Sequence, residues 1–438
     1  MSLGEPNPVT TATSAAPQLA DDERLRRLQA LGVLCGFAAG AWLGAAEAPT
    51  KLVTMGITPV VVSLMMVFGV FLARWSFPAL IQGTAYVRDD VRQAPHLVVW
   101  AVVAGCMWAV ANTLTIFAIR DIGLSIAFPL WNSNSLLGIF WGCVLFHELR
   151  GAGRRRWLGV LGGALVMFAG AVLLAKASST HAAAGHAYRG VLAALGAGAL
   201  WGTMYIPYRK AYLTGMNPLS FVTFFTIGEL GMMTTLAIHY SGGLQPLWQQ
   251  LRGARPVLFW LLLGGFIWVV GDLFQQYAAK YIGISRGIPL SNTNQLWGLL
   301  WGILVFRELQ DASGNTYTQV VAGSLLMAAG AGGIALSSAT GQEYLRWQKA
   351  AARESQRYGV ASEYVCTRMF GRERRNVSHT WVDWTLVSLA TLIIVWFGVA
   401  ARIPRLDLQW GWMGGLTLAM LVLLVGCSMA LWRLTRFS

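Results

Sequence analysis

Charged residues are scarce in this chain. Asp, Glu, Lys and Arg make up 12% of its 438 residues, whereas a soluble globular protein carries about 25%. Hydrophobic residues make up 55%, and the 20 tryptophans and 49 glycines belong to residue types that are favoured in membrane proteins. The composition therefore excludes a soluble globular domain and indicates a polytopic membrane protein.

Residues that bind metals or form disulfides are also few. The five cysteines are scattered without a metal or redox spacing, and the six histidines are dispersed without an H-E-x-x-H motif. These absences argue against a membrane-embedded enzyme and against a metal site. We therefore expect no enzymatic activity and no cofactor.

Positive charge exceeds negative charge, because 33 Lys and Arg stand against 19 Asp and Glu, a net charge of +14. A basic balance can reflect nucleic-acid binding, but here the charges gather in loops between apolar spans. This pattern favours contact with lipid headgroups over a nucleic-acid partner. Since strongly basic loops alternate with loops of isolated charges, the positive-inside rule places both termini in the cytoplasm, in a multi-pass protein of the cell membrane.

A helix needs about 20 apolar residues to cross the hydrocarbon of a bilayer. Residues 1–27 are polar and lack a basic segment before an apolar core, so we expect a disordered cytoplasmic tail rather than a signal peptide. Residues 339–383 are rich in arginine, which favours a solvated basic cytoplasmic loop over a membrane-surface helix or a docking site. The expected spans are 28–48, 57–82, 97–119, 123–146, 156–176, 189–209, 218–240, 256–279, 284–306, 317–338, 384–401 and 411–432.

One phrase of the sequence occurs twice. Residues 121–149 read DIGLSIAFPLWNSNSLLGIFWGCVLFHEL, and 160 residues later the chain reads YIGISRGIPLSNTNQLWGLLWGILVFREL. The duplication divides the chain into two five-span repeats, 28–176 and 189–338, followed by the 339–383 loop and a two-helix extension at 384–438.

An odd number of spans gives the two repeats opposite orientations in the membrane, and inverted repeats are typical of secondary transporters. A duplication kept for packing alone is the alternative, but polar residues recur together with the packing residues. The predicted fold is an all-α polytopic membrane protein. It consists of a ten-helix inverted repeat (5+5 transmembrane helices) plus two extra C-terminal transmembrane helices.

The repeated segments carry a resemblance to a known family. GCMWAVANTLTIFAIRDIGLSIAFPL and GFIWVVGDLFQQYAAKYIGISRGIPL are each followed by an apolar helix that ends in F-x-E-L, and RRRWLGVLGGALVMFAGAVLL follows the first. Over residues 28–338 the chain resembles the drug/metabolite transporter superfamily. Within it, the chain resembles the glucose/ribose porter (sugar uptake) branch first and the rhamnose–proton symporter branch second. The resemblance implies a ten-helix sugar carrier, and the last two spans depart from that pattern.

Each copy of the phrase places two asparagines in an apolar run, Asn132 and Asn134 in the first and Asn292 and Asn294 in the second. Residues two positions apart lie about 200° apart on a regular helix, so both cannot face one seam. A proline precedes each pair, and its missing backbone donor favours a helical break. Such a break lets the amides, together with Gln295, line a solute path. Interhelical hydrogen bonds that hold the bundle together are the alternative.

Sugars bind to side chains that both donate and accept hydrogen bonds, and to aromatic rings that stack on their apolar faces. Trp108 and Asn112 lie one turn apart, and Trp268 and Asp272 repeat this spacing in the second copy. Gln275 extends the second pair. These residues join the asparagines as candidate substrate-binding residues, although tryptophans also form the interfacial belts of membrane proteins.

Coupling to an ion gradient needs a group that changes charge, and carboxylates inside apolar spans mark functional sites. Asp272, Glu229 and Glu47 are the candidates for proton coupling. Asp272 comes first because it replaces the asparagine of the first repeat, and Glu229 comes second. Glu148 and Glu308 end their helices beside basic residues, which favours caps or gate contacts.

These features together predict proton-coupled uptake of a monosaccharide by alternating access. The partners are then a small solute, the proton and the lipid bilayer, and homo-oligomerisation stays open. Transport or export of another small polar metabolite, such as a ureide, a nucleoside or a drug-like solute, is the alternative, because a fold does not determine its solute. A receptor or scaffold that uses the basic loop would not need the repeated polar residues.

Overall fold

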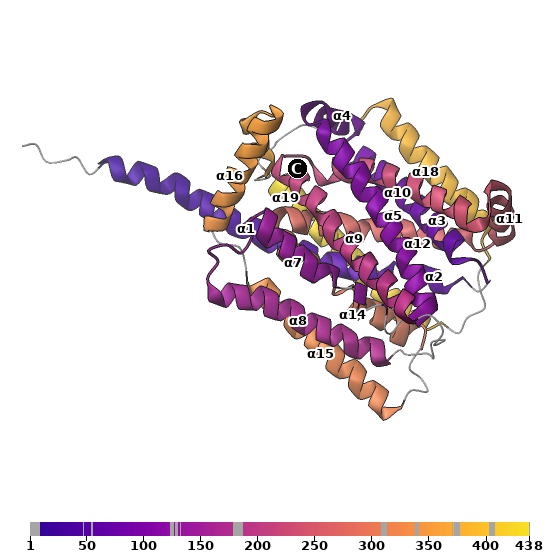
Figure 1. Cartoon of the computed structure of the whole chain (residues 1–438). Helices are drawn as coiled ribbons and strands as arrows, with labels where there is room; N and C mark the ends of the chain where they lie inside the picture. Colours follow the sequence, from indigo (N-terminus) through magenta and orange to yellow (C-terminus); the bar gives the residue numbers. More distant parts are fainter. Residues whose placement is uncertain are drawn as a thin grey trace, which may run out of the picture.

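The structure is a computed structural model, and it describes residues 9–437 except 47, 54–55, 123–126, 128–129, 132, 178–186, 308–312, 338–340, 370, 372–376 and 403–407. Ten helices in this part of the chain contain segments long and apolar enough to cross a membrane (Figure 1). They are α1 (Val9–Ala45), α3 (Pro59–Ile81), α5 (His96–Ile122), α8 (Arg154–Ala177), α9 (Ala187–Leu213), α10 (Pro218–Ser241), α12 (Leu258–Ile282), α15 (Gly314–Leu336), α18 (Trp381–Ala400) and α19 (Trp410–Thr435). The chain is an all-α polytopic membrane protein, as predicted.

Shorter helices connect and cover the long ones. They are α2 (Ala48–Lys51), α4 (Thr84–Gln93), α7 (Asn134–Leu145), α11 (Leu244–Ala254), α13 (Ile284–Ser291), α14 (Asn294–Leu300), the π-helix η2 (Trp301–Val305), α16 (Gly341–Tyr358) and α17 (Ser362–Met369). Helices α4, α16 and α17 gather at one end of the bundle, which we call the α16 face (Figure 1).

Two of the twelve expected spans are not continuous helices. The expected span 284–306 is divided into α13, α14 and η2. Within the expected span 123–146, the longest described helix is α7. After Pro289, the backbone N–H of Thr293 bonds to Leu290 only three residues back, at 3.3 Å. The backbone N–H of Ser133 likewise bonds to the carbonyl oxygen of Leu130, three residues back, at 3.3 Å. The predicted break is thus confirmed at 292–293, and the first copy turns at the equivalent position.

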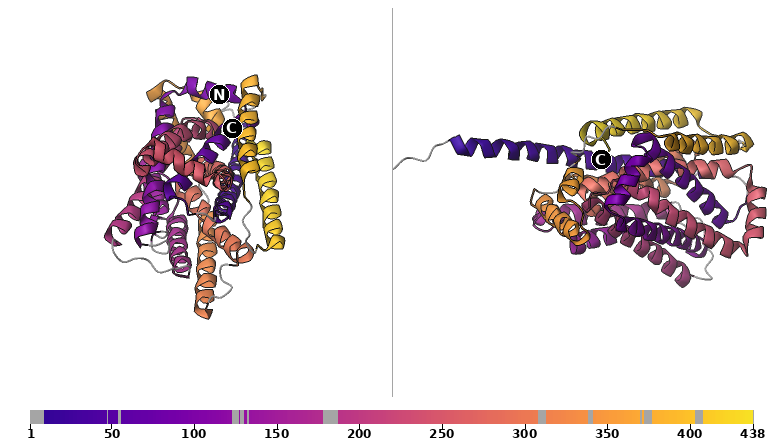
Figure 2. Two further views of the ribbon diagram at one scale, coloured as in Figure 1. Left: turned by 90° about the vertical axis from the view of Figure 1, so that its right-hand side faces the viewer. Right: turned by 90° about the horizontal axis from the view of Figure 1, so that it is seen from above.

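The last two spans, α18 and α19, lie along one side of the bundle (Figure 2). Helix α18 packs against α3, and α19 packs against α1. Large apolar side chains on their outer faces are exposed, for example Trp396 on α18 and Val422 on α19. An exposed apolar face is the expected state of a helix that contacts lipid.

Two segments differ from the expectation of disorder or solvation. Helix α1 begins at Val9, inside the segment 1–27, and this stretch contains alanines and arginines that favour helix. The segment 339–383 contains α16 and α17. Tyr344, Trp347 and Ala351 recur at helical spacing and are buried against the bundle. The basic residues of α16 occupy the opposite side of an amphipathic helix, which is why composition alone indicated a solvated loop.

Helices approach one another most closely at glycines that recur in both repeats. A Cβ on Gly69 of α3 or on Gly265 of α12 would lie 2.1 Å and 1.9 Å from a carbonyl oxygen of the other helix. Gly228 of α10 and Gly105 of α5 make the equivalent contacts at 2.1 Å and 2.0 Å. Only glycine lets two helix backbones come this close.

The contact between α8 and α15 is reciprocal. A Cβ on Gly163 would lie 2.6 Å from the carbonyl oxygen of Gly330, and one on Gly330 would lie 2.5 Å from that of Gly163. Gly170 and Gly323 face each other in the same way, at 2.7 Å and 2.9 Å. Gly323 and Gly330 follow Gly163 and Gly170 by 160 residues, so each repeat presents the same surface to the other.

The glycine contacts predict opposite effects for two neighbouring substitutions on α10. A methyl group on Gly228 meets the Val102 carbonyl at 2.1 Å, so G228A should destabilise the fold by about 1–3 kcal/mol through overpacking. A methyl group on Gly231 meets nothing within 4 Å. G231A should therefore be neutral or stabilising by up to about 1 kcal/mol, because alanine favours helix. Thermal unfolding in one detergent compares the two variants, and equal melting temperatures would contradict the prediction.

Candidate functional site

Three charged side chains meet inside the bundle. The guanidinium of Arg74 on α3 donates a hydrogen bond to Glu229 on α10 at 2.6 Å and another to Asp272 on α12 at 2.7 Å. All three side chains are buried. Ions taken out of water need a close partner, because the desolvation cost is several kcal/mol for each. One cation faces two carboxylates, so this charged cluster is neutral when it holds one proton.

Sequence reasoning identified both carboxylates of the charged cluster and missed the cation. Arg74 lies within the expected apolar span 57–82. A charged side chain inside the membrane is energetically costly whether it is a carboxylate or an arginine, so Arg74 marks a functional site by the same reasoning. The positive-inside rule considers the basic residues of loops, so an arginine within a span was overlooked.

Aromatic rings enclose the guanidinium. The Arg74 Cζ lies 4.5 Å from the ring centroid of Phe225 and 5.3 Å from that of Trp268. Trp268 meets Trp108 edge to face, with ring centroids 5.6 Å apart. The two tryptophans expected from the repeat therefore lie together beside the charged cluster, where ring faces attract a cation.

Polar residues on α12 extend the charged cluster. The amide of Gln276 donates to Asp272 at 2.8 Å, and the Tyr212 hydroxyl donates to the Gln276 carbonyl oxygen. Gln275, one of the expected site residues, donates instead to the hydroxyl of Ser291 at 2.6 Å. Because Ser291 ends α13, α12 links the charged cluster to the broken helix.

The asparagines meet where the two broken spans face each other. The Asn292 amide donates to Asn134 at 3.4 Å and to the hydroxyl of Ser135. A cavity of about 20 Å³ beside them is lined in part by Ser135, Asn292 and Gln295, and it has room for about one water. The side-chain carbonyl oxygens of Asn294 and Gln295 are buried and have no hydrogen-bond partner among the described residues. Such oxygens cost free energy until water or a ligand pairs with them.

The remaining expected site residues lie apart or outside the described residues. The Asn112 amide donates to the Ser63 hydroxyl at 3.1 Å and so joins α5 to α3, away from the charged cluster. Asn132, Glu47 and Glu308 fall outside the described residues. The structure therefore brings together Asp272, Glu229, Trp268 and Trp108 in one group, and Asn134 and Asn292 in another.

Glu148 closes the end of α13. Its carboxylate accepts hydrogen bonds from the backbone N–H groups of Ile284 at 3.2 Å and Ser285 at 2.9 Å, and from the Ser285 hydroxyl at 2.6 Å. Arg209 on α9 pairs with it at 2.8 Å. A carboxylate at a helix N-terminus is favoured by the helix dipole. Glu148 therefore caps the N-terminus of α13.

Helix α16 covers this buried pair. The Arg209 Cζ lies 4.1 Å from the Trp347 ring, and Arg286 of α13 pairs with Glu343 at 3.1 Å. The Tyr344 hydroxyl donates to the Tyr281 carbonyl at 2.7 Å. Burial raises the pKa of the Tyr344 hydroxyl above its ordinary value, so the hydroxyl stays a donor at neutral pH. We call Glu148, Arg209, Arg286, Glu343 and Trp347 the inner layer.

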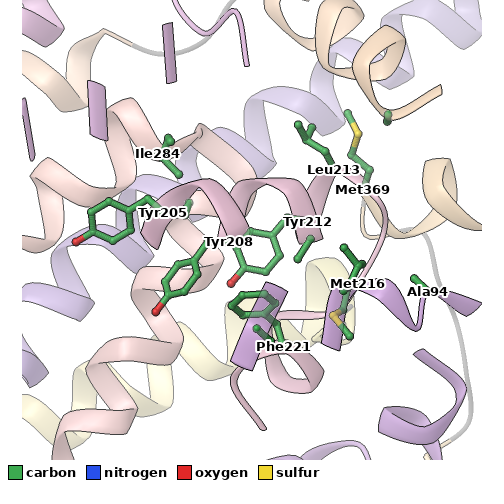
Figure 3. Close-up of a cluster of buried hydrophobic side chains, with 14 of the residues drawn as sticks. Ala94, Tyr205, Tyr208, Tyr212, Leu213, Met216, Phe221, Ile284 and Met369 are labelled. Carbon is green, nitrogen blue, oxygen red and sulfur yellow. The ribbon is translucent and has the colours of Figure 1, made fainter. Parts of the chain in front are cut away.

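Hydrogen bonds join α17 to α4 at the same end of the bundle. The Asp90 carboxylate of α4 accepts hydrogen bonds from the Tyr364 hydroxyl at 2.9 Å, from the Asn217 N–H at 3.1 Å and from Arg368. Side chains from α9, α10, α13 and α17 share the hydrophobic cluster drawn in Figure 3, which includes Tyr205, Tyr208, Tyr212, Phe221, Ile284 and Met369.

Comparison with known proteins finds similar sequences. Residues 192–363 match a family model described as "Sugar transport protein". A Listeria innocua protein with the name "Putative sugar uptake protein" is 25% identical over 242 residues, which are 55% of this chain and 78% of that protein. A Streptococcus pyogenes protein of the same name is 35% identical over 102 residues, 20% of this chain and 36% of that protein.

The fold also has a counterpart among solved structures. A protein crystal structure with 18% sequence identity superposes with a TM-score of 0.50, over 70% of this chain and 97% of that chain. At this identity the likeness concerns the fold alone.

From the contacts of the charged cluster we predict an order of stability among variants of its three residues. R74Q leaves two buried carboxylates without their cation, so it should destabilise the fold by about 3–5 kcal/mol. E229Q and D272N each leave one cation with one carboxylate, so both should stay closer to wild type. The double variant R74Q/E229Q should be more stable than R74Q, because it removes one of the two unpaired charges.

Thermal unfolding in detergent, with size-exclusion profiles, measures this order. The control is R252Q, which removes an exposed arginine of α11. If R74Q unfolds at the same temperature as R252Q, the ion pairs do not hold the three helices together.

Proposed function

We propose that this chain is a secondary active transporter that takes up a monosaccharide together with a proton by alternating access. The observation that carries the proposal is the buried charged cluster of Arg74, Glu229 and Asp272, whose net charge depends on one proton. The match to a sugar transport family model and the similarity to proteins named for sugar uptake support a sugar as the solute.

In this proposal the repeats 28–176 and 189–338 are inverted halves of one carrier. The reciprocal contacts of Gly163 with Gly330 and of Gly170 with Gly323 support it, because they are the pattern that a two-fold axis produces. Halves related in this way can rock about a central site and expose it to each side in turn. The segments 1–27, 339–383 and 384–438 are then additions to the carrier.

The solute path runs between the charged cluster and the asparagines. The rings of Trp108 and Trp268 offer faces for a pyranose, and Asn134 and Asn292 offer amides that both donate and accept. The side-chain oxygens of Asn294 and Gln295, which have no hydrogen-bond partner in the described part of the chain, suit sugar hydroxyls, which are good donors. Asn132 and Gln275 complete the proposed set, whereas Asn112, which bonds to Ser63, lies apart from this path.

Asp272 carries the coupling proton. When Asp272 is protonated, Arg74 and Glu229 remain a neutral pair, and the buried cluster has no net charge. A neutral cluster lowers the cost of rearranging helices in a medium of low dielectric constant. Asn112 stands at the equivalent position of the first repeat, so only the second of these two positions holds a carboxylate.

Solute uptake into proteoliposomes with an imposed pH gradient tests the function. The panel contains labelled monosaccharides, ureides and nucleosides. We expect saturable uptake of a monosaccharide that depends on the inward proton gradient. Uptake of a ureide or a nucleoside instead would support a carrier but contradict a sugar as its solute. The absence of any transport by folded protein would contradict the whole proposal.

D272N separates transport from coupling. Without a proton carrier, the variant should still exchange labelled for unlabelled sugar across the membrane, but it should no longer accumulate sugar against a gradient. E363Q is the control, because it removes an exposed carboxylate of α17. Gradient-driven accumulation by D272N at the wild-type level would exclude Asp272 as the carrier.

We propose that the α16 face is the cytoplasmic side and that the inner layer closes it. Glu148 and Arg209 belong to different repeats, and Trp347 of α16 covers their contact. Opening this side requires α16 to move away from α9. Lys210 of α9 and Glu354 of α16 provide a direct test, because their charged atoms lie 3.5 Å apart and both remain partly exposed.

A carbodiimide should join Lys210 to Glu354 as an amide and stop transport, because the link prevents α16 from leaving α9. The control is K210R, which keeps the positive charge but cannot form that amide under the same treatment. We expect the reagent to inhibit the wild type and to spare K210R, measured as counterflow in proteoliposomes. Full activity of wild-type protein in which mass spectrometry finds the crosslink would show that α16 does not gate transport.

A further inference from the structure

A groove opens between α3, α4 and α10 at the α16 face. Its volume is about 280 Å³. Most of the side chains that form its wall are apolar, and they come from two membrane helices and from the short helix α4. The lining residues are Trp75, Pro78, Thr84, Val87, Arg88, Val91, Thr223 and Phe224.

Two polar groups in this groove point to a ligand. The indole N–H of Trp75 is buried and has no hydrogen-bond partner among the described residues. An unpaired buried donor costs about 1–3 kcal/mol, so an acceptor at this position is favoured. Arg88 is exposed at the edge of the groove, and Arg92 is exposed one turn further along α4. The groove therefore combines an apolar wall, one buried donor and a cationic rim.

The depth of these groups matches the layers of a bilayer leaflet. Helix α3 ends at Ile81, and Trp75 precedes that end by six residues, which is about 9 Å at 1.5 Å per residue. With Ile81 at the headgroup level, the indole lies at the depth of ester groups and upper acyl chains. Helix α4 lies at the end of the bundle, where Arg88 and Arg92 can meet phosphate.

We propose that this groove binds an anionic glycerophospholipid of the surrounding membrane. Arg88 holds the phosphate, and the Trp75 indole donates to an ester carbonyl oxygen. One acyl chain lies against Pro78, Val87 and Phe224. A sugar does not suit this surface, because the wall offers few hydrogen-bonding groups for its hydroxyls.

The lipid would support the charged cluster from outside. Thr223, which lines the groove, donates a hydrogen bond to the backbone carbonyl of Arg74 at 3.1 Å. Trp75 follows Arg74 directly in the chain, and Phe225, whose ring lies against the Arg74 guanidinium, follows the groove residue Phe224. A lipid that fills the groove therefore restrains the α3–α10 contact that presents Arg74 to Glu229. This inference does not depend on which solute the chain transports.

Native mass spectrometry of the full chain tests the site. Purified protein is titrated with phosphatidylglycerol and, separately, with phosphatidylcholine of the same acyl chains. We expect tighter binding of phosphatidylglycerol and a higher melting temperature in its presence. R88Q should weaken phosphatidylglycerol binding about fivefold, the usual effect of one basic residue near a membrane surface. W75F, which keeps the ring but removes the N–H, should weaken the binding of this lipid as well.

The matched control is R353Q, which removes an exposed arginine of α16 on the same face. It should leave lipid binding unchanged. Equal binding of the two lipids to the wild type would overturn the anionic specificity. An equal loss in R353Q and R88Q would show a diffuse attraction and overturn the site, as would unchanged binding in both R88Q and W75F.

Discussion

Arg74 stays charged inside the bundle because two carboxylates from different helices reach it at hydrogen-bond distance. Contacts of 2.6 Å and 2.7 Å leave little freedom for α3, α10 and α12 to slide past one another. Close glycine contacts accompany this geometry, since Gly69 and Gly265 bring the backbones of α3 and α12 together, and Gly228 brings α10 against α5. The aromatic rings of Phe225 and Trp268 then cover the guanidinium. Charge balance and backbone proximity therefore determine the centre of the molecule jointly.

The same principle operates a second time at the α16 face. Arg209 and Arg286 are buried with Glu148 and Glu343 as partners, and α16 supplies one of those partners. Displacing α16 without a replacement would leave Arg286 buried and unpaired, a state that costs several kcal/mol. Any motion of this helix therefore has to exchange charged partners or admit water. The charged cluster and the inner layer thus both resist independent movement of the helices that hold them.

Much of this architecture could be predicted from the sequence, because its signals are local or periodic. The apolar spans and the break near Pro289 follow from residues close together in the chain, and the repeat follows from a match at a constant offset of 160 residues. The pairing of Arg74 could not be predicted, since its partners lie 155 and 198 residues away. The docking of α16 was missed for another reason. Its apolar stripe of Tyr344, Trp347 and Ala351 is narrow, and the surrounding charges dominate any average over the segment.

The seam between α8 and α15 has an evolutionary consequence. Gly163 contacts Gly330 and Gly170 contacts Gly323, so the surface is self-complementary between the two repeats. A surface of this kind can join two separate copies of one half before a gene fusion makes them a single chain. In such a dimer every residue occurs twice, and a carboxylate at the position of Asp272 would bring its own copy. A single chain is free of that constraint, and this one holds an asparagine, Asn112, and an aspartate, Asp272, at the two equivalent positions.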